Sequence, residues 1–294
     1  MSDSDPKEGK LLEWPGPRSS IQNLRRKLVS IARGPRFGVP RPLFAAWEEI
    51  AAEIKMARSV AVLSDFDGTL ASIRRRPETV QMSERVRKAL ALLAKRGALV
   101  GVVSGRSLAD VRRRVGLSGI CYVGCHGYLM ESSRGHVVTL VHRGEKKLLA
   151  RVRRELGAKL KDLSGIELEI KEAGIAIHYR GANRRNTRAA RSVVKEMSSR
   201  HRRLHLLEGK KVWEFVPGPG VDKWTAVRFL LALEDRADPI VIYIGDDMTD
   251  EHVFSRMRGV SVAVGKRRRT AAKFYVQSPS DVRRFLEKLS EAIR

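Results

Sequence analysis

The stretch Asp65-Phe66-Asp67-Gly68-Thr69-Leu70 decides the fold expected for this chain. It follows the apolar run Ser-Val-Ala-Val-Leu at residues 59–63, which is typical of a buried parallel strand. The two carboxylates are therefore expected at the carboxyl end of a strand, where open α/β sheets hold their ligands. An Asp-Gly turn after a strand is the alternative interpretation of the same residues.

A second acidic loop follows a second apolar run. The run at residues 239–244 ends in Gly245-Asp246-Asp247-Met248-Thr249-Asp250-Glu251. Two acidic loops after two buried strands can meet in space, and their carboxylates repel one another unless a cation lies between them. Oxygen ligands alone favour a hard ion such as Mg²⁺. The sequence therefore predicts a magnesium site.

Two further loops follow apolar runs. Residues 98–103 lead into Ser104-Gly105-Arg106-Ser107, which offers a hydroxyl, a flexible backbone and a guanidinium, the groups that bind anions. A loop with a helix N-cap at Ser107 is an equally good interpretation. Residues 120–123 lead into Gly124-Cys125-His126-Gly127, which brings an imidazole to the same edge of the sheet.

The pattern of elements indicates an α/β fold with a doubly wound, mostly parallel sheet and an inserted α+β cap. Helices are expected at residues 42–57, 80–95 and from 107 to 115, between the apolar strands. The cap pattern is a helix and a hairpin, repeated once: 145–163, 166–171 with 175–180, 186–201, and 203–207 with 211–216. The predicted domains are a basic, mobile N-terminal arm at 1–41, a catalytic core at 42–129 and 218–294, and the cap at 130–217.

The cap hairpins are expected to have one polar face, because side chains alternate along a strand and the two helices cover the apolar face. Directional polar groups on such a face suit a substrate with many hydroxyls. A face that only meets solvent is the alternative. The residues of this face are Glu169, Lys171, His178, Arg180, Lys210 and Glu214.

The composition of the chain bears on which kinds of partner it can bind. The formal net charge is +25 over 294 residues, but the basic runs are scattered and lack interleaved aromatic residues, which favours a solvated surface over specific nucleic-acid binding. No apolar stretch approaches the roughly 20 residues of a membrane helix, and the N-terminus does not have the pattern of a signal peptide. We therefore expect no membrane partner and a cytoplasmic location, in which Cys121 and Cys125 are reduced thiols.

The four loops, in this order, resemble those of the haloacid dehalogenase phosphohydrolases. A fifth segment, Gly209-Lys210-Lys211-Val212-Trp213-Glu214-Phe215-Val216-Pro217 with Lys223 shortly after, makes the chain look most like the trehalose-6-phosphate phosphatases. The resemblance spans roughly residues 63–264, and both order and spacing agree. It implies a magnesium-dependent phosphatase with a HAD-like core and a substrate-covering cap.

The resemblance implies a role for each matching core residue. Asp65 would attack phosphorus and form an aspartyl-phosphate, while Asp67 would act as general acid and base. Magnesium would be held by the carboxylates of Asp65 and Asp246 and the backbone carbonyl of Asp67. Phosphoryl oxygens would be held by Ser104, Gly105, Arg106 and Lys223, with Asp247 and Asp250 in support. Asp110 and Glu78 are interpreted as surface residues without a role.

The substrate implied by the resemblance is trehalose 6-phosphate, with a functional link to a trehalose-phosphate synthase. Glu169 with Lys171, and Lys210 with Glu214, match positions that hold the sugar rings in that family, and His126, His178 and Arg180 complete the predicted substrate-binding set. Two departures, Val216 in place of a basic residue and Trp224 in place of glycine, affect the sugar contacts and the Lys223 turn. A phosphatase acting on sucrose phosphate or a glycosyl-glycerate phosphate, and a non-catalytic sugar-phosphate-binding protein, are the alternatives.

Overall fold

The computed structural model describes residues 38–74, 76–209, 211–218, 220–235, 238–265 and 269–293. Two predictions therefore lie outside the described residues: the mobility of nearly all of the N-terminal arm, and the role of Lys210. The described chain divides into two compact units, a core formed by residues up to Thr139 and from Asp222 onward, and a cap at Leu140–Val221.

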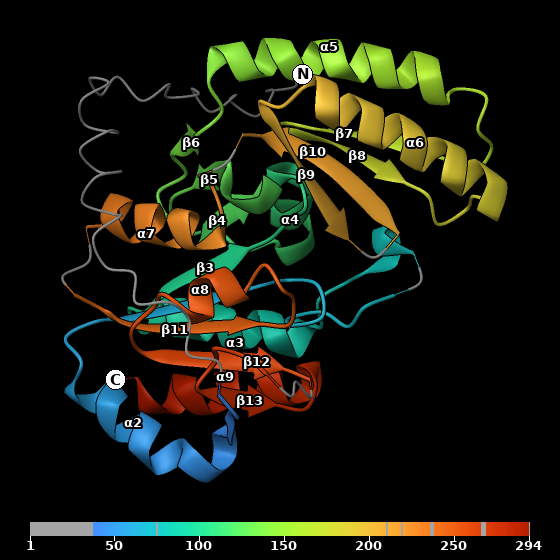
Figure 1. Ribbon diagram of the computed structural model, residues 1–294. Coiled ribbons are helices and arrows are strands. Elements are labelled where there is room, and N and C mark those ends of the chain that lie inside the picture. Colours follow the sequence, from blue (N-terminus) through green and yellow to red (C-terminus); the bar gives the residue numbers. More distant parts are fainter. Residues whose placement is uncertain are drawn as a thin grey trace, which may run out of the picture. The chain divides into compact units, whose positions relative to one another are not determined.

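The core is built on a mostly parallel sheet, as the apolar runs predict. Its strand order is β1-β13-β12-β11-β2-β3-β4-β5-β6 (Figure 1). The pairs from β1 to β4 are parallel, and the last two, β4 with β5 and β5 with β6, are antiparallel. The strands are β1 (Arg41–Pro42), β2 (Val60–Ser64), β3 (Leu99–Val103), β4 (Cys121–Gly124), β5 (Leu129–Glu131), β6 (Val137–Thr139), β11 (Ile240–Gly245), β12 (Val260–Val264) and β13 (Phe274–Val276).

Helices cover both faces of this sheet, and the predicted doubly wound α/β class is confirmed. In Figure 1, α7 and α8 lie in front of the sheet and α3 and α4 lie behind it. Leu230 of α7 lies against Gly101 of β3, and Arg87 of α3 donates to the carbonyl of Val115 at the end of α4. The core helices are α2 (Trp47–Met56), α3 (Glu84–Lys95), α4 (Leu108–Val115), α7 (Lys223–Leu233), α8 (Glu251–Phe254) and α9 (Pro279–Ala292), with single 3-10 turns η1 (Leu43–Ala46), η2 (Pro77–Thr79) and η3 (Cys125–Gly127).

At both edges of the core sheet, the structure includes residues that the sequence-based boundaries assign to the cap or to the arm. Residues 129–131 and 137–139 are strands of the core sheet, because Leu129, Met130 and Val138 are buried against β4 and each other. The chain therefore leaves the core at 139 rather than 129. At the other edge, Gly38 pairs with Thr270 and Arg41 with Phe274, so the last residues assigned to the arm belong to the core.

The cap unit has the predicted repeat of helix and hairpin. Its antiparallel sheet has the order β7-β8-β10-β9, and α5 and α6 pack on one face. Trp213, Phe215, Ile175 and Ile177 fill the space between sheet and helices. The elements are α5 (Arg143–Leu160), β7 (Glu167–Lys171), β8 (Gly174–His178), α6 (Arg184–Arg200), β9 (Leu204–Gly209) and β10 (Val212–Pro217).

The return from the cap to the core is fixed at Asp222, the N-cap of α7. Its Oδ1 accepts from the backbone N–H and the hydroxyl of Thr225 at 2.8 and 2.9 Å, and its Oδ2 accepts from Arg256 at 2.6 Å. An Asp at this position satisfies an N–H group that the first helical turn leaves without a partner. Lys223, the next residue, therefore starts from a fixed backbone.

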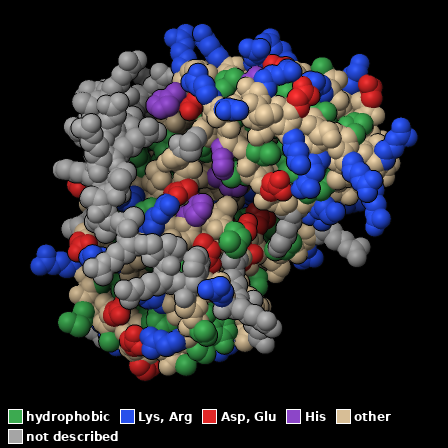
Figure 2. Space-filling view, viewed as in Figure 1, with side chains coloured by type: hydrophobic (Ala, Val, Ile, Leu, Met, Phe, Trp, Pro, Cys, Tyr) green, Lys and Arg blue, Asp and Glu red, His purple; other side chains and the backbone are tan. Residues whose placement is uncertain are grey.

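The surface is as basic as the composition predicts. Figure 2 shows Lys and Arg side chains spread over the visible face, with acidic side chains between them. No helix in the described parts of the chain has the length and apolar character needed to cross a membrane.

Candidate functional site

The two acidic loops meet at the carboxyl ends of β2 and β11. These strands are parallel neighbours in the sheet, so the loops that follow them emerge at one edge. Asp65, Asp246 and Asp250 each place a carboxylate oxygen within 4.8 Å of the others. Asp65 and Asp250 are buried. The convergence expected from the sequence is thus present in the core.

Lys223 lies between two of these carboxylates. Its Nζ donates to Oδ1 of Asp65 at 2.8 Å and to Oδ1 of Asp250 at 2.7 Å, and its side chain is 3% exposed. Burial alone lowers the pKa of a lysine, but the charges of Asp250 and Asp65 outweigh it and raise the pKa of Lys223. Lys223 therefore stays protonated at neutral pH and contributes a fixed positive charge.

Asp250 accepts hydrogen bonds at both of its carboxylate oxygens. Its Oδ1 also accepts from the hydroxyl of Tyr243 at 2.8 Å, and its Oδ2 accepts from the backbone N–H of Asp247 at 2.9 Å. Burial raises the pKa of Tyr243, with the charge of Asp250 acting in the same direction, so this hydroxyl remains a donor. Asp250 thus contacts both Lys223 and the backbone of its own loop, and its supporting role stays a prediction.

Asp65 and Asp246 are the carboxylates with the right chemistry for a divalent cation. Burial raises the pKa of Asp65 well above its ordinary value, Lys223 opposes this, and the charges of Asp250 and Asp246 raise the pKa further. A cation here would favour the ionised form of Asp65. Two carboxylates beside a backbone loop make an all-oxygen donor set, which fits Mg²⁺ or a similar hard ion.

Gly68 lets the first loop close on Asp246. Its φ is +83°, and a Cβ at this position would lie 2.1 Å from Oδ2 of Asp246. The hydroxyl of Thr69 lies 3.5 Å from the other oxygen, Oδ1. The Asp-Gly pair is therefore more than a turn, because the missing side chain makes room for a carboxylate from the neighbouring strand.

Gly68→Ala is expected to weaken binding of a divalent cation by at least about 10-fold, since the new methyl group displaces Asp246. The shift of the melting temperature on adding MgCl₂ or MnCl₂ measures this. Gly97→Ala is the matched control, because Gly97 has nearly the same φ, +86°, but nothing within 4 Å of its Cβ position. Both variants carry the same backbone strain, about 1 kcal/mol. Equal cation affinity in the two variants would contradict the proposed contact.

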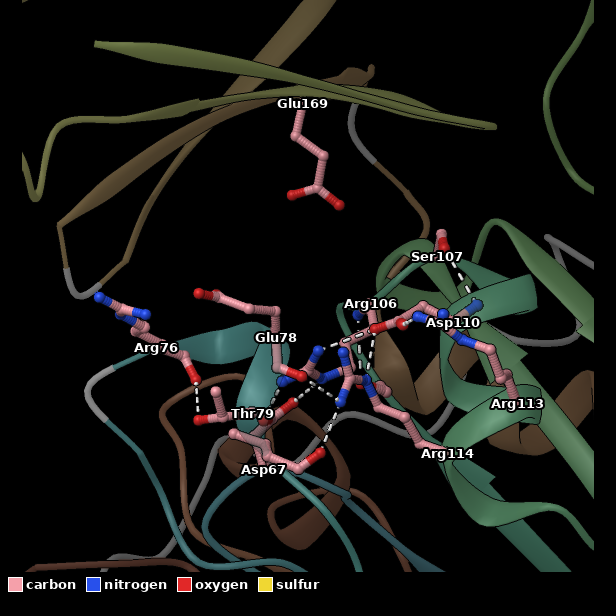
Figure 3. A network of polar contacts seen from close by, with 12 residues as sticks. Asp67, Arg76, Glu78, Thr79, Arg106, Ser107, Asp110, Arg113, Arg114 and Glu169 are labelled. Atoms are coloured by element: carbon pink, nitrogen blue, oxygen red, sulfur yellow. Dashed lines mark hydrogen bonds and ion pairs between the residues drawn. The ribbon is translucent and has the colours of Figure 1, made fainter. Parts of the chain in front are cut away.

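Arg106 contacts two carboxylates, although the sequence predicts a phosphate ligand (Figure 3). Its Nε donates to Oδ2 of Asp67 at 2.6 Å and its Nη2 to Oδ1 at 2.7 Å. Its Nη1 donates to Oδ2 of Asp110 at 2.8 Å. Burial alone lowers the pKa of Arg106, but hydrogen bonds to Asp67 and Asp110 raise it. In this structure the Arg106 guanidinium binds Asp110 and the second aspartate of the Asp-x-Asp motif, and its role as a phosphate ligand stays a prediction.

Asp110 is not the surface residue that the sequence suggests. Beyond Arg106 it accepts from Arg114 at 2.7 Å and Arg113 at 2.6 Å, and its side chain is 21% exposed. Burial alone raises the pKa of Asp110, but the hydrogen bonds from these arginines hold it far below the ordinary value. The spacing is the signal that could have identified Asp110: Arg106 precedes it by four residues, and Arg113 and Arg114 follow it by three and four.

The remaining loops of the core are locked to one another. His126 donates its backbone N–H to the carbonyl of Ser104 at 3.2 Å, and Cys125 donates to the carbonyl of Arg106 at 2.7 Å. A Cβ at Gly105 would lie 2.5 Å from Cε1 of His126, so the imidazole packs on this loop. The Ser104 hydroxyl accepts from the backbone N–H of Arg106 at 3.1 Å, which leaves its own proton to donate to an anion.

The predicted polar face of the cap sheet is present. The register places Glu169 opposite Ala176, and Ala176 opposite Glu214, on the side away from the helices. Lys171 donates to Glu214 at 2.8 Å, and both side chains are less than a tenth exposed. Glu169 and His178 approach to 2.8 Å, and this hydrogen bond lowers the pKa of Glu169. Arg180 is exposed just beyond β8.

The structure shows the surroundings of Val216 and Trp224, the two residues that depart from the family pattern. Val216 is 2% exposed and lies in β10 against Gly174. Trp224 is half-buried with the guanidinium of Arg228 over its ring at 5.9 Å. Lys223 keeps both of its carboxylate contacts beside this tryptophan.

The comparisons with known proteins agree on one family. The family model described as trehalose-phosphatase matches residues 63–290. A trehalose-phosphate phosphatase of Mycobacterium tuberculosis (strain ATCC 25618 / H37Rv) is 35% identical over 249 residues, which cover 81% of this chain and 63% of the relative. A probable trehalose-phosphate phosphatase D of Arabidopsis thaliana is 32% identical over 262 residues, 83% of this chain and 70% of the relative.

A solved structure shares the fold. The C-terminal domain of C. albicans trehalose-6-phosphate phosphatase superposes with a TM-score of 0.71 at 21% identity, covering 87% of this chain and 99% of that domain. The chain spans about 63% of the length of the mycobacterial relatives it matches. The length of the family match and the identity to these relatives confirm the resemblance seen in the motifs: the chain belongs to the trehalose-phosphatase family.

Proposed function

We propose that this chain is a phosphatase that hydrolyses trehalose 6-phosphate to trehalose and phosphate. The observation that carries the proposal is the buried Asp65 carboxylate, held by Lys223 at 2.8 Å beside Asp246. A buried carboxylate fixed by a lysine and next to a second carboxylate suits nucleophilic attack on a phosphate monoester. The family membership supports the same reaction.

The chemistry takes two steps. Oδ2 of Asp65 attacks phosphorus, the bond from phosphorus to the sugar oxygen breaks, and that oxygen takes a proton from Asp67. Water then attacks the phosphorus of the aspartyl-phosphate and gives a proton to Asp67, and the Asp65 carboxylate is released. General acid and base catalysis of this kind contributes about 10² to 10⁴-fold. Splitting the reaction through a covalent intermediate replaces one difficult step by two easier ones.

The charge of the transferring phosphoryl group has to be offset. Lys223 contributes its positive charge. The Ser104 hydroxyl, which accepts from the backbone N–H of Arg106, has its own proton to donate to a phosphoryl oxygen. Mg²⁺, held by Asp65, Asp246 and the backbone carbonyl of Asp67, would supply Lewis-acid stabilisation of the phosphoryl oxygens. Gly105 and His126 shape this edge of the loop, while Asp247 and Asp250 support it.

Sugar selection is assigned to the polar face of the cap sheet. Its Glu, Lys and His side chains, Glu169, Lys171, His178 and Glu214, are directional partners for hydroxyl groups. Arg180 and Lys210 complete the proposed set. A functional link to a trehalose-phosphate synthase and a cytoplasmic location both remain predictions from the sequence.

Phosphate release from a panel of substrates tests the proposal. Trehalose 6-phosphate, sucrose 6-phosphate, glucose 6-phosphate and p-nitrophenyl phosphate are compared with and without MgCl₂. We expect a magnesium-dependent preference for trehalose 6-phosphate. A preference for another sugar phosphate would keep the mechanism and overturn the substrate. No release from any of the four would favour a non-catalytic sugar-phosphate-binding protein.

A further inference from the structure

The second aspartate of the Asp-x-Asp motif is held by a chain of charged contacts that starts on another element. Both oxygens of Asp67 accept from Arg106, at 2.6 and 2.7 Å, and the Asp67 side chain is 37% exposed while that of Arg106 is 13% exposed. A bidentate guanidinium fixes the plane of a carboxylate as well as its position. Each carboxylate oxygen keeps a second lone pair, so Asp67 can still exchange a proton.

Arg106 needs a fixed position of its own in order to orient Asp67. Asp110 provides it, since its Oδ2 accepts from Nη1 of Arg106 at 2.8 Å. The ring of Phe66 lies 5.6 Å from the Arg106 guanidinium carbon and supports it from a third direction. One nitrogen pair of the guanidinium thus faces the reacting aspartate, and the remaining terminal nitrogen faces α4.

Asp110 is itself immobilised. Arg114 donates to its Oδ2 and Arg113 to its Oδ1, while its backbone N–H donates to the N-cap Ser107. Arg114 also donates to the carbonyls of Glu78 and Val80, which ties α4 to the segment after the Asp-x-Asp loop (Figure 3). These contacts connect α4 to Asp67 through Asp110 and Arg106.

We propose that Asp110 is a positioning residue, which acts through Arg106 to hold Asp67 in the orientation needed to protonate the leaving sugar oxygen. The inference rests on the proposed phosphatase function. Without the Asp110 carboxylate, Arg106 loses the contact at Nη1 that fixes the direction of its fork. The Asp67 carboxylate is then still there, but it is no longer held in the orientation that proton transfer needs.

The test uses the leaving group. A sugar alkoxide needs a proton to depart, whereas p-nitrophenolate leaves without one, so an acid that is misplaced slows only the first substrate. We expect Asp110→Asn to lower kcat/KM for trehalose 6-phosphate by about 10 to 100-fold, the usual effect of removing a group that orients a functional side chain. The kcat/KM for p-nitrophenyl phosphate should change by less than about 3-fold, because this ratio reports the steps up to cleavage of the leaving group.

Asp281→Asn is the matched control. Asp281 is the third residue of α9, as Asp110 is the third residue of α4. It follows a serine by three positions and pairs with Arg284 at i+3, whereas Asp110 contacts Arg106. Asp281→Asn should keep the wild-type kcat/KM for both substrates. Arg106→Lys keeps the charge but loses the fork, and it should reproduce the selective loss if Asp110→Asn does not fold.

Two results would overturn the inference. Equal losses for both substrates in Asp110→Asn and Arg106→Lys would mean a general structural role, and unchanged kinetics would mean no role. A wild-type protein that hydrolyses neither substrate would overturn the proposed function itself, and with it this inference. The wild-type measurement separates that failure from a failure of Asp110 alone.

Discussion

Replacing Asp65 by Asn should lower magnesium-dependent phosphate release from trehalose 6-phosphate by at least about 10⁴-fold, as loss of a covalent nucleophile does in other enzymes. The amide has nearly the same shape but cannot attack phosphorus, and it no longer balances the charge of Lys223. Single-turnover measurements with enzyme in excess give the rate without interference from product release. Circular dichroism establishes that the variant is folded.

The controls for Asp65→Asn are chosen to separate chemistry from binding. Asp281→Asn removes a carboxylate from the start of α9 and should keep wild-type turnover. Isothermal titration with trehalose 6-phosphate should show that Asp65→Asn still binds substrate. A folded Asp65→Asn variant that retains more than a tenth of the wild-type rate would rule out the covalent mechanism.

Replacing Lys223 by Met should destabilise the protein by about 3 to 5 kcal/mol, the usual cost of removing one partner from a buried ion pair. The lysine is 3% exposed and contacts two carboxylates, which the variant leaves buried without a counter-charge. Urea unfolding in the absence of metal measures the difference. Lys88→Met, at an exposed position of α3, should change the free energy of unfolding by less than about 0.5 kcal/mol.

The pH dependence of this difference follows from the raised pKa of Lys223. A group whose folded pKa is raised contributes stability that is present below its unfolded pKa and lost as pH rises through the folded pKa. An unfolded lysine loses its proton near about 10.4. Loss of the Lys223 proton should therefore take nothing from the advantage of wild type over Lys223→Met between pH 7 and about pH 9.5. The advantage can only grow there as pH rises, because the variant raises the pKa of the buried Asp65 further. A decline that begins within this interval would show that the carboxylates do not hold the proton on Lys223.

The sequence predicts the core because its signals are local. Apolar runs of five or six residues with an acidic or small-residue loop after each one identify parallel strands and their common edge. The cap could be predicted equally well from the sequence. Alternation along its hairpins places Trp213 and Phe215 on the face that packs on the helices and Glu214 on the opposite face. The short edge strands were missed because β5 and β6 have three residues each, too few for a period to be visible.

The partner of Arg106 could not be predicted for a different reason. A Ser-Gly-Arg loop indicates that an anion is bound, but the choice between a phosphate and two carboxylates depends on where α4 places Asp110 and where the first loop turns Asp67. Both placements depend on how the core packs, because Asp67 and Arg106 are 39 residues apart in the chain. Likewise, Gly68 has the same backbone geometry as any Asp-Gly turn, and only the position of Asp246 shows what the glycine makes room for.

The placement of the cap as a single insertion has a consequence for how new specificities can arise. Every residue proposed to act on phosphorus lies before Thr139 or after Asp222, and the segment between them has its own hydrophobic core. The downstream junction is secured on the core side, because Asp222 is bound to Thr225 and Arg256 independently of any cap residue. A cap from another sugar phosphatase could thus be transplanted between these two positions as a module, changing the sugar that is accepted while the hydrolytic machinery is inherited intact.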